Sequence, residues 1–362
     1  MDARKGFGLS ESRVQKSNQS ALNSVVPHDL VQRTYSRLRE TYAKDLCENW
    51  AEEAEPPKNV FVSLRIAAFV IESWRCMYGI APTNEAYEAK SPSKFSGFVD
   101  VACGNGVLVY VLLMEGYEGW GFDACRRTSW SAFPSRVQER LMEKAFIPRP
   151  FMNVLQKQQF DVDVHLGDFP QDTFIISNHA DELTVWTPLM AALACPGSPM
   201  PFLAIPCCSH SLSGAKYRYP QPSNFNSKDE KESFQESQQP ASGDLRALRA
   251  LKQKEKTEEG ILDSMYGSLT AKIMVVAQEI GYEVQKSLLP IPGPRNMGVI
   301  GRYRAAIERG QGLGQSNDSA LRRKLGDIVQ RECIRDGGLE MAARMWVERA
   351  QGLHRQVGGR SH

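Results

Sequence analysis

The sequence lacks the cysteine pairs at C-x-x-C spacing that mark zinc ribbons and redox motifs. Its eight cysteines lie singly, except for the adjacent Cys207 and Cys208, and no apolar signal segment precedes them. We therefore expect reduced, intracellular thiols rather than a disulfide framework. We also expect no bound metal, because adjacent cysteines cannot easily both reach one tetrahedral ion alongside His210, two residues on, and no second ligand pair has a suitable spacing.

Long hydrophobic runs and an excess of one charge are missing too. The longest apolar segment, near residues 60–74, is interrupted by Arg65 and Glu72, so we expect no segment that spans or enters a membrane. The net charge is only +2, which excludes the chain-wide basic field of a nucleic-acid coat protein. An anionic partner must therefore be bound by local patches.

What the sequence does contain is enough apolar material for a sizeable core. The chain has 362 residues, of which 42% are hydrophobic and 24% charged, and no internal repeat is visible. These values favour one main domain with extensions. We predict a disordered N-terminus (1–25), a helical N-terminal region (26–90), an α/β domain (91–304) with a flexible Pro/Ser/Gln-rich insertion at 213–260, and a helical C-terminal extension (305–362).

The α/β prediction rests on a strand, turn, helix and strand within about 30 residues, which is the pattern of a βαβ unit. Residues 98–106 read FVDVACGNG, an apolar-rich helix follows at 107–116, and WGFDA begins at Trp120. The expected strands are 98–102, 120–124, 162–168, 173–179, 201–208, 282–289 and 297–303. Helical spacing appears at 30–50, 60–78, 187–194, 262–280 and 321–353. We expect a seven-stranded, mostly parallel, Rossmann-like sheet between layers of helices.

The turn Cys103-Gly104-Asn105-Gly106 indicates a ligand close to the backbone, because glycine has no Cβ and tolerates positive φ. Dinucleotides and S-adenosylmethionine both bind over such a turn. The dinucleotide fingerprint G-x-G-x-x-G fails here, since its third glycine position is Val109. The spacing therefore favours S-adenosylmethionine over NAD.

Acidic residues end the first three expected strands. Asp100 precedes the turn and suits the ammonium of the methionine moiety, Asp123 can accept from both ribose hydroxyls, and Asp168 would face the adenine edge. Ala124 and Asn178, at neighbouring strand ends, complete the expected cofactor site. Two simpler interpretations stay open: the glycine turn as an ordinary loop, and Asp168 as a helix cap.

The fourth expected strand ends in residues that would face the transferred methyl group. We expect Asp181 to be the main polar anchor, with His179 or Glu182 as a general base. The alternative use of Asn178 and Asp181 is to cap the following helix, which is compatible with catalysis. Lys216, after the fifth strand, is a further candidate for stabilising an alkoxide.

Cations interleaved with aromatic residues suggest contacts to RNA. Lys216, Tyr217, Arg218 and Tyr219 alternate charge and ring, a pattern that pairs phosphates while a splayed base stacks. We expect further contacts from a set of basic residues at other loops: Arg126, Arg127, His210 and Arg295. The alternative for each basic run is a solvated surface.

Several segments together carry a resemblance to a known family. The glycine turn is widely shared among methyltransferases, whereas HADELT at 179–184 and IPCCSH at 205–210 are much more discriminating. From about residue 58 to 353, apart from the insertion, the chain resembles the fungal tRNA(Ser) uracil-2'-O-methyltransferases, which are class I S-adenosylmethionine-dependent enzymes. One departure is Ala102, where the methyltransferase turn often has glycine.

The resemblance implies a class I methyltransferase domain over 91–304. It also implies S-adenosyl-L-methionine as cofactor, the 2'-hydroxyl of uridine 44 in tRNA(Ser) as methyl acceptor, and a cytoplasmic location. Two rival functions remain: a methyltransferase acting on a protein or small molecule, and a non-catalytic RNA-binding scaffold that has kept the fold.

Overall fold

The computed structural model describes residues 26–80, 95–155, 163–220, 265–291, 295–303 and 315–358. The predicted disordered N-terminus, and the predicted insertion beyond residue 220, lie outside the described residues. No helix in the described part of the chain has both the length and the apolar character needed to cross a membrane.

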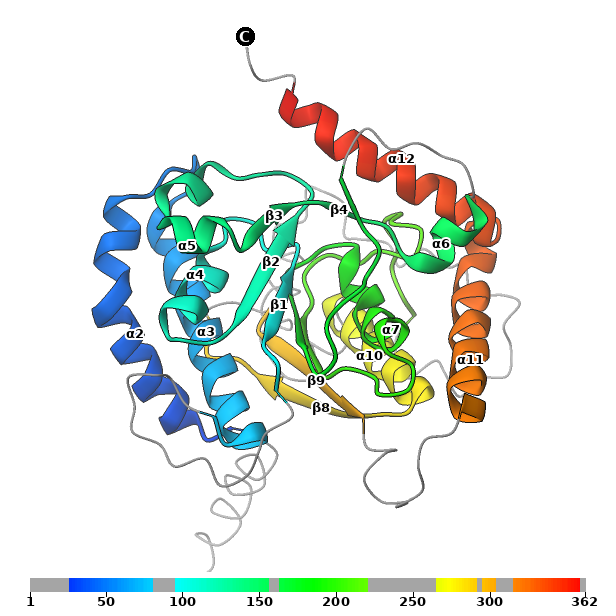
Figure 1. Ribbon diagram of the computed structural model, residues 1–362, viewed down its shortest axis with the longest axis horizontal. Coiled ribbons are helices and arrows are strands. Elements are labelled where there is room, and N and C mark those ends of the chain that lie inside the picture. The colour runs from blue at the N-terminus through cyan, green and yellow to red at the C-terminus, as the bar shows by residue number, and fades with distance from the viewer. Residues whose placement is uncertain are drawn as a thin grey trace, which may run out of the picture.

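A seven-stranded sheet occupies the centre of the molecule (Figure 1), in the order β3-β2-β1-β6-β7-β9-β8. Its strands are β1 (Phe98–Val101), β2 (Gly119–Asp123), β3 (Leu141–Glu143), β6 (Phe174–Asn178), β7 (Phe202–Ile205), β8 (Tyr282–Leu288) and β9 (Met297–Tyr303). The first five pair in parallel, whereas β9 runs antiparallel to β7 and β8. The expected class I methyltransferase fold is confirmed. The order reverses between β1 and β6, where α/β sheets bind ligands.

Helices cover both faces of the sheet (Figure 1). One side carries α2 (His28–Glu48), α3 (Pro56–Tyr78), α4 (Val107–Met114) and α5 (Ser135–Gln138), and the other carries α7 (Leu183–Ala194), α10 (Met265–Ile280) and α11 (Gln315–Cys333). Two further helices, α6 (Arg149–Val154) and α12 (Leu339–Gly358), pack on each other. Short 3₁₀ turns lie at Thr128–Ala132 and Ile334–Asp336.

Successive side chains of the central strands point to opposite faces of the sheet and pack into two hydrophobic cores. Phe98 and Ile176 pack with α2, α3 and α4, whereas Val99 and Ile175 pack with α7 and α10. Strands buried on both faces read as apolar runs, which is why the sequence reveals them. Because the N-terminal helices share a core with the sheet, their described residues are part of the same packed body.

Glycines end two of the expected helices. Gly79 has a φ of +64° and closes α3, which begins at Pro56. The single helical stretch expected over 321–353 is instead two helices. Gly337 and Gly338 adopt positive φ between α11 and α12, so the chain turns there.

The prediction for the third strand is wrong. Residues 162–168 supply only β5 (Val164–His165), which pairs with β4 (Ala145–Phe146) in a separate two-stranded sheet. The third strand of the main sheet in chain order is β3, at the edge of the sheet, and its three residues show too little apolar pattern to be recognised. This shift moves Asp168 away from the expected line of strand ends.

His165 packs between aromatic rings in this small sheet. Its ring stacks on Phe122 and Phe169 at centroid distances of 4.7 and 5.0 Å, and its Nδ1 accepts a hydrogen bond from the Gly167 N–H at 3.0 Å. Burial, helped by the charge of Lys144, lowers the pKa of His165 to about 4. The imidazole is therefore neutral in the folded protein.

We predict that His165 makes the protein less stable as the pH falls from about 6.5 to about 4. In that range the unfolded chain binds a proton, at an ordinary histidine pKa of about 6.5, that the folded chain excludes. His165→Asn cannot titrate, and it retains an acceptor near the position of Nδ1. Urea unfolding across this pH range should show a shallower loss of stability for the variant. Parallel curves for the two proteins would contradict the assignment.

Candidate active site

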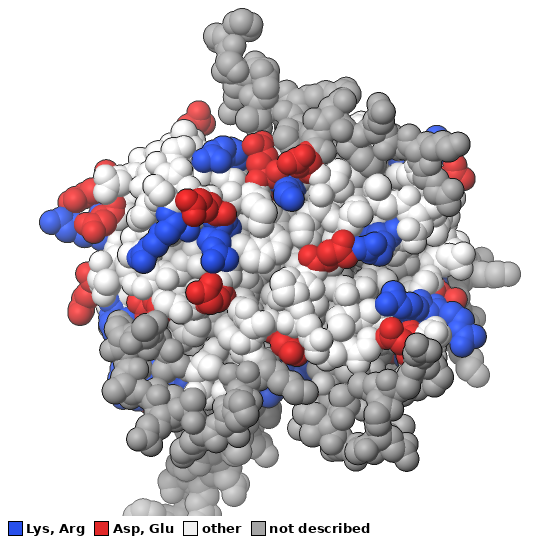
Figure 2. Space-filling view, in the orientation of Figure 1, with Lys and Arg blue, Asp and Glu red and all other residues white. Residues whose placement is uncertain are grey.

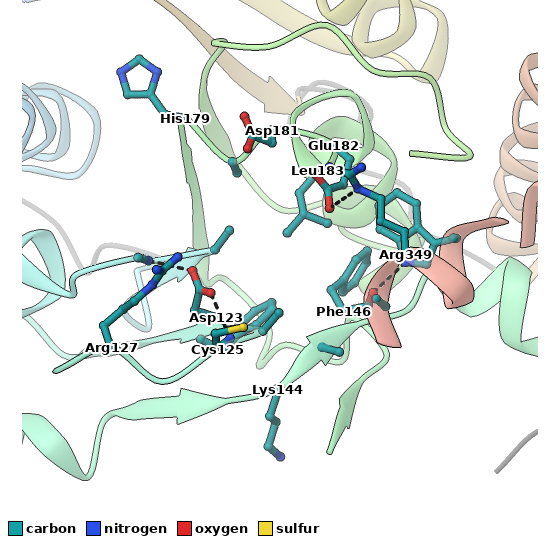
Figure 3. Close-up of a pocket in the computed structure, with 18 residues that line it drawn as sticks. Asp123, Cys125, Arg127, Lys144, Phe146, His179, Asp181, Glu182, Leu183 and Arg349 are labelled. Carbon is teal, nitrogen blue, oxygen red and sulfur yellow. Dashed lines mark hydrogen bonds and ion pairs between the residues drawn. The ribbon is translucent and has the colours of Figure 1, made fainter. Parts of the chain in front are cut away.

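A cavity of about 270 Å³ opens over the carboxyl ends of β1, β2 and β6 (Figure 3). Five segments distant in sequence line it: the turn after β1, the loop after β2, the segment after β3, the loop after β6, and the helix α12. Seven of the residues predicted for the site lie in its wall: Gly104, Asp123, Ala124, Arg127, His179, Asp181 and Glu182. Their roles stay predictions, but the fold brings these seven residues to one place.

The floor of the cavity is bare backbone beside a carboxylate. Ala102 and Gly104 adopt left-handed φ values of +55° and +53°. The Asp123 carboxylate accepts hydrogen bonds from the N–H groups of Gly104 at 2.9 Å and Cys125 at 3.1 Å. A carboxylate has about four acceptor positions, so two stay open for hydroxyl donors. Burial raises the pKa of Asp123, and these N–H groups oppose the shift.

Two buried polar atoms at the strand ends have no partner. Asp100 is 1% exposed, and its Oδ1 accepts no hydrogen bond. The Oδ1 of Asn178, at the end of the neighbouring strand, is likewise unpaired. Burial, and then the charge of Asp123, raise the pKa of Asp100 well above its usual value. Neither residue is part of the cavity wall. Orphaned buried acceptors are costly unless a ligand or water satisfies them, so both suit a cationic or hydroxylated ligand near the strand ends.

The loop after β6 carries the candidate catalytic groups. His179 and Asp181 both have positive φ, +52° and +43°. Burial, and then the charge of Arg295, lower the pKa of His179, so its imidazole is neutral near pH 7. Glu182 instead forms two hydrogen bonds with Arg349 of α12, at 3.0 and 3.2 Å (Figure 3).

Helix α12 supplies one wall of the cavity, which sequence reasoning missed. Trp346, Arg349 and Ala350 line it, and the Trp346 indole N–H donates to the Phe146 carbonyl at 2.8 Å. Glu182 and Arg349 are 167 positions apart. The amphipathic pattern of α12 predicts a helix, but no local signal indicates which residues it meets.

The segment after β3 supplies another missed part of the wall. Lys144, Ala145 and Phe146 line the cavity beside Leu183 and Cys125. The signal in the sequence is limited to two short apolar groups, Leu141-Met142 and Ala145-Phe146-Ile147. The apolar side chains of Phe146, Leu183 and Trp346 form a surface suited to a flat heterocycle.

Several predicted cofactor residues lie outside the cavity wall. The Asp168 side chain is 69% exposed and pairs with Arg149, so its assignment to an adenine edge is not supported by its position. Cys103 is buried, with its thiol packed toward Gly121. The Asn105 side-chain oxygen accepts a hydrogen bond from the Val107 N–H at 3.0 Å, where the turn leads into α4. Cys103 and Asn105 therefore support the turn on the side away from the cavity.

Gly106 also supports the turn from behind. It is the N-cap of α4 with a φ of +74°, and a Cβ there would approach Leu141, Phe133 and Trp130 at 3.0 to 3.2 Å. The requirement for glycine at this position is therefore both conformational and steric.

The aromatic residues predicted to stack on RNA are used within the protein. Tyr219 is 6% exposed and donates its hydroxyl proton to the His210 carbonyl at 3.0 Å, and the ring of Tyr217 lies under Arg335 at 3.4 Å. The prediction of base stacking by Tyr219 is therefore wrong. His210 is also buried, whereas Lys216 is exposed and lies outside the cavity wall.

The remaining predicted RNA contacts are surface arginines. Arg126, Arg218 and Arg295 are exposed, and Arg126 lies 5.7 Å from the Trp130 ring. Arg127 lies beside Asp123 at the cavity (Figure 3). On the face shown in Figure 2, Lys and Arg are interspersed with Asp and Glu and form no continuous basic area among the described residues.

Comparison with known proteins gives a consistent result. A family described as "Predicted AdoMet-dependent methyltransferase" matches residues 25–148. The chain is 53% identical to a tRNA (uracil-O(2)-)-methyltransferase of Aspergillus oryzae over 97% of its own length. Proteins of the same name from Neurospora crassa and Schizosaccharomyces pombe are 38% and 35% identical over 77% of the chain. Over most of its own length the chain is thus similar to proteins named as tRNA methyltransferases. No solved structure matches it.

The family resemblance drawn from the sequence is thus confirmed. The chain spans about half the length of these relatives, 58% of the Aspergillus protein and 48% of the other two. The AdoMet-dependent family, the fold and the unpaired acceptors agree on S-adenosylmethionine as the cofactor.

We predict different costs for alanine at the two glycines of the turn. Gly104 and Gly106 both have left-handed φ, so an added Cβ costs about 1 kcal/mol at either. At Gly106 it also meets packed side chains, whereas at Gly104 it meets nothing within 4 Å. Gly106→Ala should lose about 2 to 4 kcal/mol of unfolding free energy and Gly104→Ala about 1. Urea unfolding measures both, and equal losses would contradict the packing argument.

We also predict that Arg349 contributes to cofactor binding through the wall formed by α12. Arg349→Gln breaks the bidentate pair with Glu182 and should raise the Kd for S-adenosylmethionine about tenfold, as measured by calorimetry. Arg344→Gln is the matched control, because Arg344 lies on the same helix in an exposed pair with Glu340. Equal Kd values for the parent and both variants would exclude a role for this wall.

Proposed function

We propose that the chain carries the catalytic domain of a tRNA methyltransferase that uses S-adenosylmethionine to methylate a uridine 2'-hydroxyl. The observation that carries this proposal is the single cavity where Gly104, Asp123 and Asp181 meet at successive strand ends. The finer specificity, uridine 44 of tRNA(Ser) in the cytoplasm, rests on the sequence resemblance. The relatives' printed names agree with tRNA uracil methylation.

The strand-end residues hold the cofactor. S-adenosylmethionine supplies an electrophilic methyl group on a sulfonium. Asp100 and Asn178 offer unpaired acceptors for the ammonium of its methionine part. Asp123 keeps two acceptor positions for the ribose hydroxyls, and the backbone at Gly104 allows close approach. Phe146 and Trp346 exclude water from the adenine.

The loop after β6 aligns and deprotonates the acceptor. Asp181 anchors the ribose, and alignment alone contributes roughly 7 to 11 kcal/mol to such a step. The 2'-oxygen forms the new bond to the methyl carbon as the carbon–sulfur bond breaks, and the hydroxyl proton passes to a base. His179 suits this role, since it is neutral, whereas Glu182 is engaged by Arg349.

Binding of tRNA relies on exposed cations rather than on the buried tyrosines. Arg127 and Lys144 line the cavity, and the charge of Arg295 acts on His179. Lys216 and Arg218 extend this set at the surface. Phosphate contacts of this kind fix the orientation of an RNA and make its affinity fall with salt.

Three aspartate variants test the proposal. Asp123→Ala should raise the Kd for S-adenosylmethionine by about 10-fold or more, because hydrogen bonds to a charged acceptor contribute roughly 1.5 to 3 kcal/mol each. Asp181→Ala should leave that Kd near the parent value and abolish methyl transfer to unmodified tRNA transcripts. Asp168→Ala, outside the cavity, is the matched control and should behave as the parent does.

The assay uses labelled S-adenosylmethionine and maps the modified nucleotide. A parental rate for Asp181→Ala would refute the catalytic assignment. Label found in protein but never in tRNA would point to a different acceptor. An absence of cofactor binding in calorimetry would favour a non-catalytic scaffold.

A further inference from the structure

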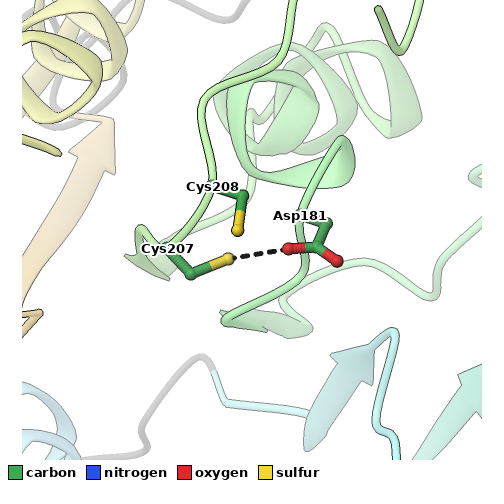
Figure 4. A group of neighbouring side chains, drawn as sticks. All are labelled: Asp181, Cys207 and Cys208. Atoms are coloured by element: carbon green, nitrogen blue, oxygen red, sulfur yellow. Dashed lines mark hydrogen bonds between the residues drawn. The ribbon is translucent and has the colours of Figure 1, made fainter. Parts of the chain in front are cut away.

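Three potential metal ligands meet beside the cavity (Figure 4). Asp181 follows β6, and Cys207 and Cys208 follow β7. One carboxylate oxygen and the two sulfur atoms all lie within 4.8 Å of one another, and the Cys207 sulfur is 3.0 Å from Asp181 Oδ1. The two loops start level with each other, because Asn178 pairs with Ile205 at the ends of these parallel strands.

From the sequence we expected that adjacent cysteines could not easily both reach one metal ion. The structure shows why Cys207 and Cys208 can. Successive side chains of a strand point to opposite faces, but β7 ends at Ile205, before Pro206. In the irregular segment that follows, both sulfur atoms face the space next to Asp181 (Figure 4). The geometry, rather than the spacing in sequence, therefore brings two thiols and a carboxylate together.

The donor set selects a class of ion. Thiolates favour soft or borderline cations such as Zn²⁺ and disfavour Mg²⁺ and Ca²⁺, which bind oxygen ligands. With Zn–S near 2.3 Å and Zn–O near 2.0 to 2.2 Å, a tetrahedral ion holds sulfur and oxygen about 3.5 Å apart and two sulfurs about 3.8 Å apart. The Cys207 sulfur and Asp181 Oδ1 are 3.0 Å apart, somewhat closer than such an ion would hold them, and all three atoms lie within 4.8 Å of one another, so the set is compact enough to surround one ion.

We propose that Asp181, Cys207 and Cys208 bind one divalent cation of the zinc class. The ion ties the loop after β6 to the loop after β7 and leaves a fourth coordination position for water. It also fixes the carboxylate of Asp181, which lines the cavity. His179 and Asp181 hold left-handed backbone conformations that this cross-link would stabilise.

Cobalt provides a direct readout that does not depend on methyl transfer. The full chain, without a polyhistidine tag, is reduced, stripped with a chelator and titrated with Co²⁺. We expect the near-ultraviolet charge-transfer band of cobalt–thiolate bonds and the visible bands of tetrahedral cobalt, both removed by Zn²⁺. We also expect Zn²⁺ to raise the Tm of the parent.

Matched variants identify the ligands. Cys207→Ser with Cys208→Ser should abolish the bands and the rise in Tm, whereas Cys76→Ser with Cys195→Ser, which also removes two thiols, should keep both. Asp181→Asn should weaken binding at least tenfold while the thiolate band persists at saturation. If the double variant fails to fold by circular dichroism, Cys208→Ser alone should lose about half of the charge-transfer intensity, which scales with the number of cobalt–sulfur bonds.

Three results would overturn the proposal. These are a folded, reduced parent that shows no thiolate band, a band that survives in the double cysteine variant, and an unchanged affinity in Asp181→Asn. Because the readout is metal binding, a failure here leaves the proposed methyl transfer untouched, and an inactive enzyme that binds cobalt in this way would leave the metal site standing.

Discussion

The hydrogen bond from the Gly104 N–H to the Asp123 carboxylate joins the turn after β1 to the loop after β2. The floor of the cavity depends on it. Without this bond the carboxylate would have to satisfy its buried acceptors elsewhere, and the glycine turn would lose the partner that holds its backbone. The same bond fixes the carboxylate of Asp123 in the cavity wall. Parallel pairing of β1 with β2 puts the two loops at one edge of the sheet.

The wall of the cavity formed by α12 depends on the ion pair between Arg349 and Glu182. Arg349 holds Glu182 with two hydrogen bonds, and Trp346 bonds to the backbone at Phe146, so α12 is attached both to the loop after β6 and to the segment after β3. The matched family profile ends at residue 148, well before α12. The cavity thus combines the strand ends of a widely shared fold with a helix from the C-terminal part of this chain.

Much of this fold could be predicted from the sequence, for reasons that particular residues make clear. Strands such as Phe98–Val101 are buried on both faces and are therefore apolar runs. The turn after this strand has positive φ at Gly104 and Gly106, a conformation that glycine adopts most easily. Two features of the sheets could not be predicted from the sequence, for physical reasons. Leu141–Glu143 is too short to show a period, and the alternation over 162–168 reflects a small side sheet rather than the main one.

In the site too, some residues could be predicted from the local sequence, whereas contacts between residues far apart in the sequence could not. The acids at the ends of β1 and β2 follow from local pattern, whereas the pairing of Glu182 with Arg349 joins residues 167 positions apart. Tyr217 and Tyr219 illustrate the converse error. Their alternation with Lys216 and Arg218 resembles an RNA-binding strip, but the cations that meet their rings are Arg335 and Lys272, from elsewhere in the fold.

Backbone strain supports the location of the site independently of any likeness to other proteins. Among the described residues, four that are not glycine have positive φ, and three of them, Ala102, His179 and Asp181, line the cavity. A left-handed conformation costs roughly 1 to 2 kcal/mol for a residue with a Cβ, although Asp and His tolerate it better than most. Such costs persist where the surrounding structure holds the backbone in place, and they concentrate at functional sites. Because β1 and β6 are neighbours, the strained turns that follow them line the same cavity.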